Sequence, residues 1–329
     1  MGARSTRITD TVGTHRFPAP PRRIIALTWE AAEQVLELGI APLAVADADD
    51  YREWVVRPNL PASTLSAGTR LEPNLELLIE LKPDLILISP VLADMQVQLA
   101  RIAPVLQFDA YRHDHDNAAV ARQIFIELGR LLDRESQARQ RLQHIEQRFT
   151  QLRTRLTEHF GTPLPEVEVV RFASPAIVFV YGANAMPIHA LRRLGFTATE
   201  QQASSRWGVS QKHTIELASM QESIVLYQEP FEQAEQLFDT PLWQAMPFIR
   251  QGRFAAMRPT WSYGGAASLQ YLAEAITEAL LSLSPTAPRK CGLCCHMYAG
   301  TCQRHIINHQ KVESRLDFAW SSRVAIART

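Results

Sequence analysis

One segment constrains the fold more than any other, because the stretch from Gly68 to Ser89 encodes a loop, a short helix, a turn and a buried strand in succession. It reads GTRLEPNLELLIELKPDLILIS. Leucines at helical spacing predict a helix over 74–81, which ends before Pro83 because proline cannot continue the hydrogen-bond ladder. The apolar run at 84–88 is typical of a strand buried on both faces of a parallel sheet. The segment therefore predicts an α/β fold.

A weaker copy of this pattern lies at 207–227, where Trp-Gly is followed by a short helical segment at 215–220 and then by an apolar run. Strands alternating with helices in both halves argue for parallel sheets. Two such halves predict two lobes with a cleft between them. The loops that carry Arg70 and Trp207 would face this cleft.

The segment between the two halves has a different character. From 117 to 160 it contains no proline, and its apolar residues recur at helical spacing. We expect its second part to form one long, partly exposed helix that connects the lobes. The prediction is an α/β protein with two parallel-sheet lobes, divided into an extended lead-in over 1–20, an N-terminal lobe over 21–133, a connecting helix over 134–160, a C-terminal lobe over 161–283 and a tail over 284–329 outside the fold.

Local signals place several boundaries inside these lobes. Thr28 is expected to cap a helix over 29–38, because a threonine oxygen can accept from the free N–H groups of the first turn. Residues 254–257 are expected to form the last strand and 268–283 the closing helix.

Composition excludes several classes of protein. Lysine plus arginine and aspartate plus glutamate both number 34, so the net charge is zero and nothing favours a nucleic-acid partner. No apolar run approaches the ~20 residues that span a bilayer. The first residues lack the apolar core of a secretory signal, so no signal peptide is visible. The first 290 residues contain no cysteine, so the main fold is expected to need no disulfide.

Eight segments in a fixed order carry a resemblance to a known family. They are PRRIIAL at 21–27, VAD at 45–47, YREWV at 51–55, RLEPNLELL at 70–78, LARIAP at 99–104, TPLWQAMPF at 240–248, GRF at 252–254 and WSYG at 261–264. Through these segments the chain from about Pro21 to Ser282 resembles the ferric hydroxamate-binding proteins of ferrichrome-type ABC importers, in the helical-backbone class of periplasmic binding proteins.

The resemblance implies a function and a location. It implies a monomer in the periplasm that is not an enzyme, and that captures an iron-loaded siderophore in a largely preformed cleft and delivers it to an ABC permease in the inner membrane. The iron is carried inside the ligand, so no cofactor is expected. Hydroxamate oxygens already surround the iron, so the protein should supply aromatic walls and a guanidinium whose rigid donors suit electron-rich oxygens.

The resemblance also assigns residues to the ligand site. Arg70 occupies the position of the family's cleft arginine, Trp207 that of the second-lobe tryptophan, and Trp261 with Tyr263 that of an aromatic pair from the last loop. Trp54 matches a further aromatic residue near the rim. A lone tryptophan is more often part of a core, and only the loop positions and the resemblance favour binding. The family's aromatic residues after the third strand are replaced here by Ile88 and Leu92, and a polar residue by Val209 beside Ser210.

Two acidic residues are candidates for contact with the permease. In relatives, carboxylates on top of each lobe contact permease arginines, and Glu76 and Glu216 lie at matching positions. The alternative for both is an ordinary carboxylate on a helix surface.

Two other clusters suggest different chemistry. His113-Asp-His-Asp116 has metal-ligand residue types, although such residues before a helix more often serve as a cap. Cys291, Cys294, Cys295 and Cys302, with His296 and His305, could hold zinc or an iron–sulfur cluster. Two alternative functions therefore stay open: a binding protein for a catecholate siderophore or a cobalamin, and a siderophore-iron reductase that uses the cysteine tail.

Overall fold

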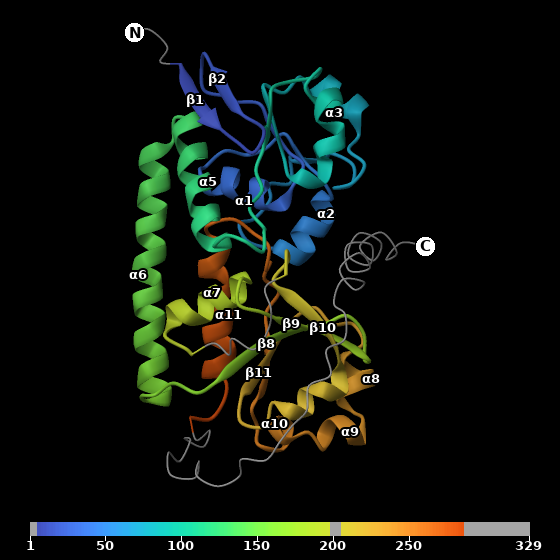
Figure 1. The fold of residues 1–329 in the computed structure, drawn as a ribbon, viewed down its shortest axis with the longest axis vertical. Coiled ribbons are helices and arrows are strands. Elements are labelled where there is room, and N and C mark those ends of the chain that lie inside the picture. The colour runs from blue at the N-terminus through green and yellow to red at the C-terminus, as the bar shows by residue number, and fades with distance from the viewer. Residues whose placement is uncertain (1–4, 198–204, 286–329) are drawn as a thin grey trace. The chain divides into compact units, whose positions relative to one another are not determined.

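The computed structural model describes residues 5–197 and 205–285, and the first half contains a wholly parallel sheet (Figure 1). Its strand order is β5-β4-β3-β6-β7. The strands are β3 (Ile24–Ala26), β4 (Ala44–Val45), β5 (Leu65–Ser66), β6 (Leu85–Ile88) and β7 (Val105–Gln107). The helices are α1 (Trp29–Glu37), α2 (Ala48–Asp50), the π-helix η1 (Tyr51–Val55), α3 (Leu75–Leu81), the 3₁₀-helix η2 (Pro90–Met95), α4 (Gln96–Leu99) and α5 (Asn117–Leu131).

The second half contains a sheet of order β10-β9-β8-β11-β12. Its strands are β8 (Val167–Phe172), β9 (Ile177–Tyr181), β10 (Val209–His213), β11 (Ile224–Gln228) and β12 (Phe254–Met257). Its helices are α7 (Met186–Leu194), the 3₁₀-helix η3 (Thr214–Ser219), α8 (Ala234–Phe238), α9 (Pro241–Gln244), α10 (Pro247–Arg250) and α11 (Ser268–Leu281). The predicted α/β class with two sheet-containing halves is confirmed.

The second sheet is mixed, so the prediction of two parallel sheets is wrong for this half. β8 pairs with β11 and β11 with β12 in parallel, whereas β9 pairs antiparallel with both β8 and β10. The reason lies in the loop 173–176 between β8 and β9. It is far too short for the crossover that a parallel pair requires, so the chain must turn back on itself.

The N-terminal residues, predicted as an extended lead-in, form a hairpin. β1 (Thr6–Thr9) pairs antiparallel with β2 (Thr14–Phe17). The side chains of Ile8 and Phe17 are buried. At the turn, Thr11 N donates to Gln107 O (3.1 Å) and Gln107 N donates to Asp10 Oδ2 (2.8 Å). The hairpin is thereby joined to the end of β7.

The long helix α6 (Glu135–Phe160) runs beside both halves (Figure 1). It packs against α5 of the first half and against α7 and α11 of the second. Its buried side chains recur at three- and four-residue intervals, which makes one continuous apolar stripe. They are Ala138, Leu142, Ile145, Phe149, Leu152, Leu156 and Phe160. No helix in the described part of the chain has the length and apolar character needed to cross a membrane.

The two halves also contact each other directly through buried polar groups. The carboxylate of Glu33 on α1 accepts hydrogen bonds from Ser268 N (2.8 Å) and Gly265 N (3.0 Å) at the start of α11. Asn117 Nδ2 donates to Asn184 O (3.0 Å). Because Glu33 satisfies N–H groups that have no partner within α11, one lobe supplies the N-terminal cap for a helix of the other.

Candidate ligand-binding site

Arg70 lies in a tight loop that follows β5. Gly68 in this loop has φ +87°, and a Cβ there would lie 2.6 Å from Glu72 O and 2.7 Å from Asn74 N. Only glycine fits such a left-handed position against another stretch of backbone. Asn74 then caps α3, since its side-chain oxygen accepts from Leu77 N (3.1 Å). The loop therefore returns to the sheet and holds Arg70 beside the end of β4.

The guanidinium of Arg70 is held by two residues of the first lobe. Its Nε donates to Asp47 Oδ2 (3.0 Å), and its backbone N donates to the same oxygen (3.1 Å). Its Cζ lies 3.8 Å from the ring centroid of Trp29, a cation–π geometry. The side chain is 21% exposed. Within the described residues neither Nη atom of Arg70 donates to a protein acceptor. The N–H groups of both Nη atoms can therefore donate to a ligand.

Five aromatic rings from both lobes form a continuous series next to Arg70, which we call the aromatic cluster. Trp29 lies 4.7 Å from Trp261 between ring centroids, and Trp261 lies 5.6 Å from Tyr263. Tyr263 lies 5.6 Å from both Trp207 and Tyr111. Most of these pairs are edge-to-face, the arrangement that aromatic quadrupoles favour. The cluster consists of Trp29, Tyr111, Trp207, Trp261 and Tyr263.

Members of the aromatic cluster differ in how far they reach the surface. Trp207 and Trp261 are half-buried, whereas Trp29, Tyr111 and Tyr263 are buried behind them. Burial raises the pKa of the Tyr111 and Tyr263 hydroxyls well above their ordinary value, so both stay neutral. A ligand would therefore contact Trp207, Trp261 and Arg70 directly. The buried rings would hold these surfaces in place.

The loop that carries Trp207 is fixed by Gly208. This glycine has φ +65°, and a Cβ there would lie 2.8 Å from both N and Cα of Ala185. Its carbonyl accepts from Gly182 N (2.7 Å), and Ser205 Oγ bonds to both Val209 N and Val209 O. These contacts set the path of the chain on either side of Trp207.

Carboxylates surround the guanidinium of Arg70. Asp47 pairs with it directly, and Glu30 lies close enough for their charges to interact. Burial raises the pKa of Glu30, and the negative charge of Asp109 adds to this increase. A hydrogen bond from Thr28 and the positive charge of Arg70 lower the pKa and so act against it. The guanidinium of Arg70 therefore lies among acidic groups rather than among other cations.

Two predicted features lie apart from this cluster. Trp54 is half-buried in η1 and makes no ring contact with any described residue of the aromatic cluster. Ile88 and Leu92 are buried in the apolar core of the first sheet, which explains why aromatic side chains are absent there. The role of Trp54 stays a prediction.

The predicted permease contacts are exposed in both lobes. Glu76 lies in the first turn of α3 and Glu216 in η3. The Oε1 of Glu216 accepts from His213 N (2.7 Å), so it also closes a capping box. Their contact with a permease stays a prediction.

The candidate metal residues have structural partners or lie outside the described residues. Asp116 caps α5 by accepting from Ala119 N (2.9 Å), as the capping alternative predicts. No group of side chains within 5–197 and 205–285 has the makeup of a metal site. The tail with Cys291, Cys294, Cys295 and Cys302 lies outside the described residues.

Three residues of the site were missed in the sequence, namely Trp29, Asp47 and Tyr111. Trp29 and Asp47 follow β3 and β4 almost directly, and Tyr111 follows β7. In open parallel sheets, ligands bind beyond the carboxyl ends of strands. A search of the residues that follow each predicted strand could therefore have found them.

Comparisons with known proteins find similar sequences and similar structures. A family model described as periplasmic binding protein matches residues 24–260. The iron(3+)-hydroxamate-binding protein FhuD of Escherichia coli K12 is 33% identical over 268 residues, covering 81% of this chain and 89% of that protein. The Fe(3+)-citrate-binding protein YfmC of Bacillus subtilis is 24% identical, covering 78% and 79%.

One solved structure is similar over nearly all of its length. It is the siderophore-binding protein FhuD from Vibrio cholerae with Fe³⁺-Desferal bound, which is 42% identical with a TM-score of 0.78 and covers 79% of this chain and 98% of that one. A catecholate-siderophore binding protein from Vibrio cholerae has a TM-score of 0.63 at 20% identity, which shows the fold alone.

Proposed function

Because the chain belongs to the periplasmic binding protein family, we propose that it is the substrate-binding component of an ABC importer and carries an iron-loaded hydroxamate siderophore to a membrane permease. The observation that carries this proposal is the position of Arg70, whose guanidinium is fixed between Asp47 and Trp29 beside the half-buried ring of Trp261. A charged donor with fixed geometry and an adjacent aromatic face suit a ligand with oxygens at its centre and an apolar scaffold around them.

The charges of the site favour hydroxamates over catecholates. A ferric tris-hydroxamate is neutral at its iron centre, whereas a ferric tris-catecholate carries several negative charges. The guanidinium of Arg70 is already paired with Asp47, and Glu30 lies beside it. An anionic complex would meet these carboxylates next to Arg70, so its contact with the guanidinium would be weaker.

Transfer of the ligand to the permease would use the exposed surfaces of the two lobes. Glu76 and Glu216 are exposed, and each has an exposed apolar neighbour: Ile79 on α3 and Ile215 on η3. A carboxylate next to an apolar side chain is suited to a partner that offers arginine. In this proposal the protein acts as a monomer in the periplasm and catalyses no reaction.

Intrinsic tryptophan fluorescence tests the proposal. Purified protein is titrated with ferrichrome and ferrioxamine, each iron-loaded and iron-free, and with a ferric catecholate for comparison. We expect saturable quenching at micromolar or lower concentration for the loaded hydroxamates, because Trp207 and Trp261 lie at the site. Absence of quenching, or stronger binding of the catecholate, would overturn the assignment.

A further inference from the structure

A polar pocket of about 330 Å³ lies where α6 meets α11 and the loop that follows η1. It shares no residue with the aromatic cluster or with Arg70. Its walls come from both lobes and from the connecting helix. They consist of Arg57, Arg141, His144, Gln147, Arg148, Gln151, Gln270 and Tyr271.

The side chains that line this pocket are suited to oxygen anions. Three are guanidiniums, one is an imidazole, three are carboxamides and one is a phenol, and none is a carboxylate. Guanidiniums present several N–H donors in a fixed plane that matches carboxylate and phosphate oxygens. The carboxamides of Gln147 and Gln151 add neutral N–H donors, whereas the hydroxyl of Tyr271 already donates to Glu37.

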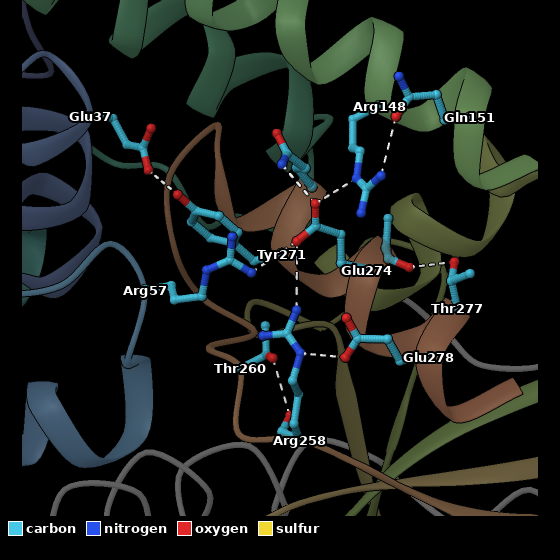
Figure 2. Close-up of polar contacts among 12 residues, drawn as sticks. Glu37, Arg57, Arg148, Gln151, Arg258, Thr260, Tyr271, Glu274, Thr277 and Glu278 are labelled. Atoms are coloured by element: carbon cyan, nitrogen blue, oxygen red, sulfur yellow. Dashed lines mark hydrogen bonds and ion pairs between the residues drawn. The ribbon is translucent and has the colours of Figure 1, made fainter. Parts of the chain in front are cut away.

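Two buried carboxylates orient the guanidiniums, and Figure 2 shows one of them, Glu274, bonded to both Arg57 and Arg148. Glu274 Oε2 accepts from Arg57 Nη1 (2.9 Å), and its Oε1 accepts from Arg148 Nε (2.8 Å). Glu37 accepts from Arg141 Nε (2.5 Å). The carboxylate side chains are 8% and 7% exposed, whereas those of Arg57 and Arg148 are 42% and 35% exposed. The acids form the base of the arrangement and the guanidiniums its open side.

This arrangement leaves donors and positive charge for a ligand. The ion-pair network behind the pocket has four guanidiniums and three carboxylates, because Glu274 also pairs with Arg258 and Arg258 with Glu278, which leaves an excess of one positive charge. Within the described residues, Arg57 Nη2 and Arg148 Nη2 donate to no protein acceptor. Arg57 Cζ also lies 4.4 Å from the ring centroid of Tyr271, which limits its motion. Donors that are already held in place lose little freedom when they bind.

We propose that this pocket binds a small multivalent oxyanion, such as a diphosphate or a tricarboxylate. The volume holds an anion with two or three charged groups, and the buried acids would make a single negative charge a weak ligand. The bound anion would contact Arg57 of the first lobe and Arg148 of the connecting helix. A ligand that binds only the folded chain stabilises it, so occupancy would raise the melting temperature.

The experiment measures binding of pyrophosphate and of citrate to the full-length protein by isothermal titration calorimetry, with the melting temperature as a second readout. Sodium chloride keeps the ionic strength constant, and acetate serves as the monovalent comparison. We expect saturable heat and a saturable rise in melting temperature with at least one multivalent anion and none with acetate. Tighter binding of pyrophosphate would identify a phosphate ligand, and tighter binding of citrate a polycarboxylate.

Two matched variants separate the pocket from general charge effects. Gln147→Glu places a carboxylate in the lining without removing any arginine–glutamate contact, whereas Gln143→Glu makes the same change one turn away on α6, outside the lining. We expect Gln147→Glu to lower anion affinity at least tenfold and Gln143→Glu to preserve it. Absence of saturable binding in the wild type, or equal affinity in both variants, would overturn the proposal. Siderophore quenching, measured in parallel, stays independent of either result.

Discussion

At the scale of single residues, the site depends on how Arg70 is held before a ligand arrives. Asp47 fixes its Nε and Trp29 covers one face of its guanidinium. Of the residues assigned by the sequence, Arg70, Trp207, Trp261 and Tyr263 lie in one cluster and Trp54 lies outside it. Trp29 and Asp47 follow β3 and β4, so a search of the residues after each strand would have offered them as candidates, but their contacts with Arg70 could not be read from the sequence.

Replacing Arg70 tests its proposed role. Arg70→Ala should weaken binding of a ferric hydroxamate by about 1.5–3 kcal/mol, the scale of a charged hydrogen bond. The change also leaves Asp47 facing the ligand. Arg70→Lys keeps the charge but loses the planar donors and the stacking on Trp29, so it should restore only part of the affinity. Fluorescence titration measures both; an unchanged affinity of Arg70→Ala would remove this residue from the site.

Glu33 should make stability depend on pH. Burial raises its pKa from 4.5 to about 7, against hydrogen bonds from Ser268 and Gly265, and the charge of Glu37 adds to the increase. The folded state therefore binds this proton more tightly than the unfolded chain. The free energy of unfolding should fall as pH rises from about 4.5 to about 7, by about 3 kcal/mol in total.

The matched variant for this effect is Glu33→Gln, which has no proton to lose. Urea unfolding at pH 5, 6, 7 and 8 should show that the decline with pH is smaller in Glu33→Gln than in the wild type. Glu30 also has a raised pKa, but its contribution is common to both proteins. Glu274 has a lowered pKa and acts below pH 4.5, outside this window. Parallel curves for the two proteins would contradict the assignment.

At the scale of elements, prediction succeeded where a local signal was strong. Thr28 caps α1, the last strand lies at Phe254–Met257 as expected, and the helix predicted over 134–160 is found at Glu135–Phe160. These elements have caps, long apolar periods or a clear apolar run. Residues 215–220, predicted as a helix, instead form the 3₁₀-helix η3 over Thr214–Ser219. So short a segment has too few hydrogen bonds for sequence to separate the two forms.

The elements that prediction missed depend on distant partners. The strands β1 and β2 are polar in sequence, and their position is set by hydrogen bonds between the hairpin turn and Gln107. The direction of β9 follows from the length of a loop rather than from the strand itself. Pairing with residues far along the chain is not encoded in local periodicity.

The Trp207 loop should be sensitive to a single methyl group. Gly208→Ala adds a Cβ that would lie 2.8 Å from Ala185 N in a left-handed backbone, so the loop must shift. Gly252→Ala is the matched control, because Gly252 has the same φ of +65° but nothing within 4 Å of its Cβ. Both should lose about 1–2 kcal/mol of stability. Only Gly208→Ala should also lower siderophore affinity. Urea unfolding measures the loss of stability, and fluorescence titration measures the affinity. Equal siderophore affinities of the two variants would contradict this reasoning.

At the scale of the whole molecule, contacts of several kinds join the two halves. They include the apolar stripe of α6, the hydrogen bonds of Glu33 to the start of α11, and the ion pairs of Glu274 with Arg57 and Arg148. The sequence predicted only the first. A buried carboxylate that pairs across lobes leaves no periodic signal. Breaking such a pair would leave a buried charge without its partner, so a large hinge motion between the lobes is disfavoured.

This rigidity predicts little closure on ligand binding. Spin labels at Val97→Cys in α4 and Leu242→Cys in α9, both exposed positions, would report the distance between the lobes. The four tail cysteines are replaced by serine in this background. We expect one distance distribution that is unchanged by saturating ferrioxamine, measured by pulsed electron resonance. A shift of several ångströms, or a second population that appears with ligand, would show a hinge.

The residues expected to contact the ligand and the buried carboxylates that join the lobes lie on different parts of the chain. Arg70, Trp207 and Trp261 lie on loops, whereas Glu33 and Glu274 lie on α1 and α11. Substitutions in the loops can therefore alter ligand preference while the joint between the lobes stays intact. The ligand specificity of such a protein can therefore evolve through a few loop substitutions when the available iron chelators change. No compensating substitutions in the core are needed first.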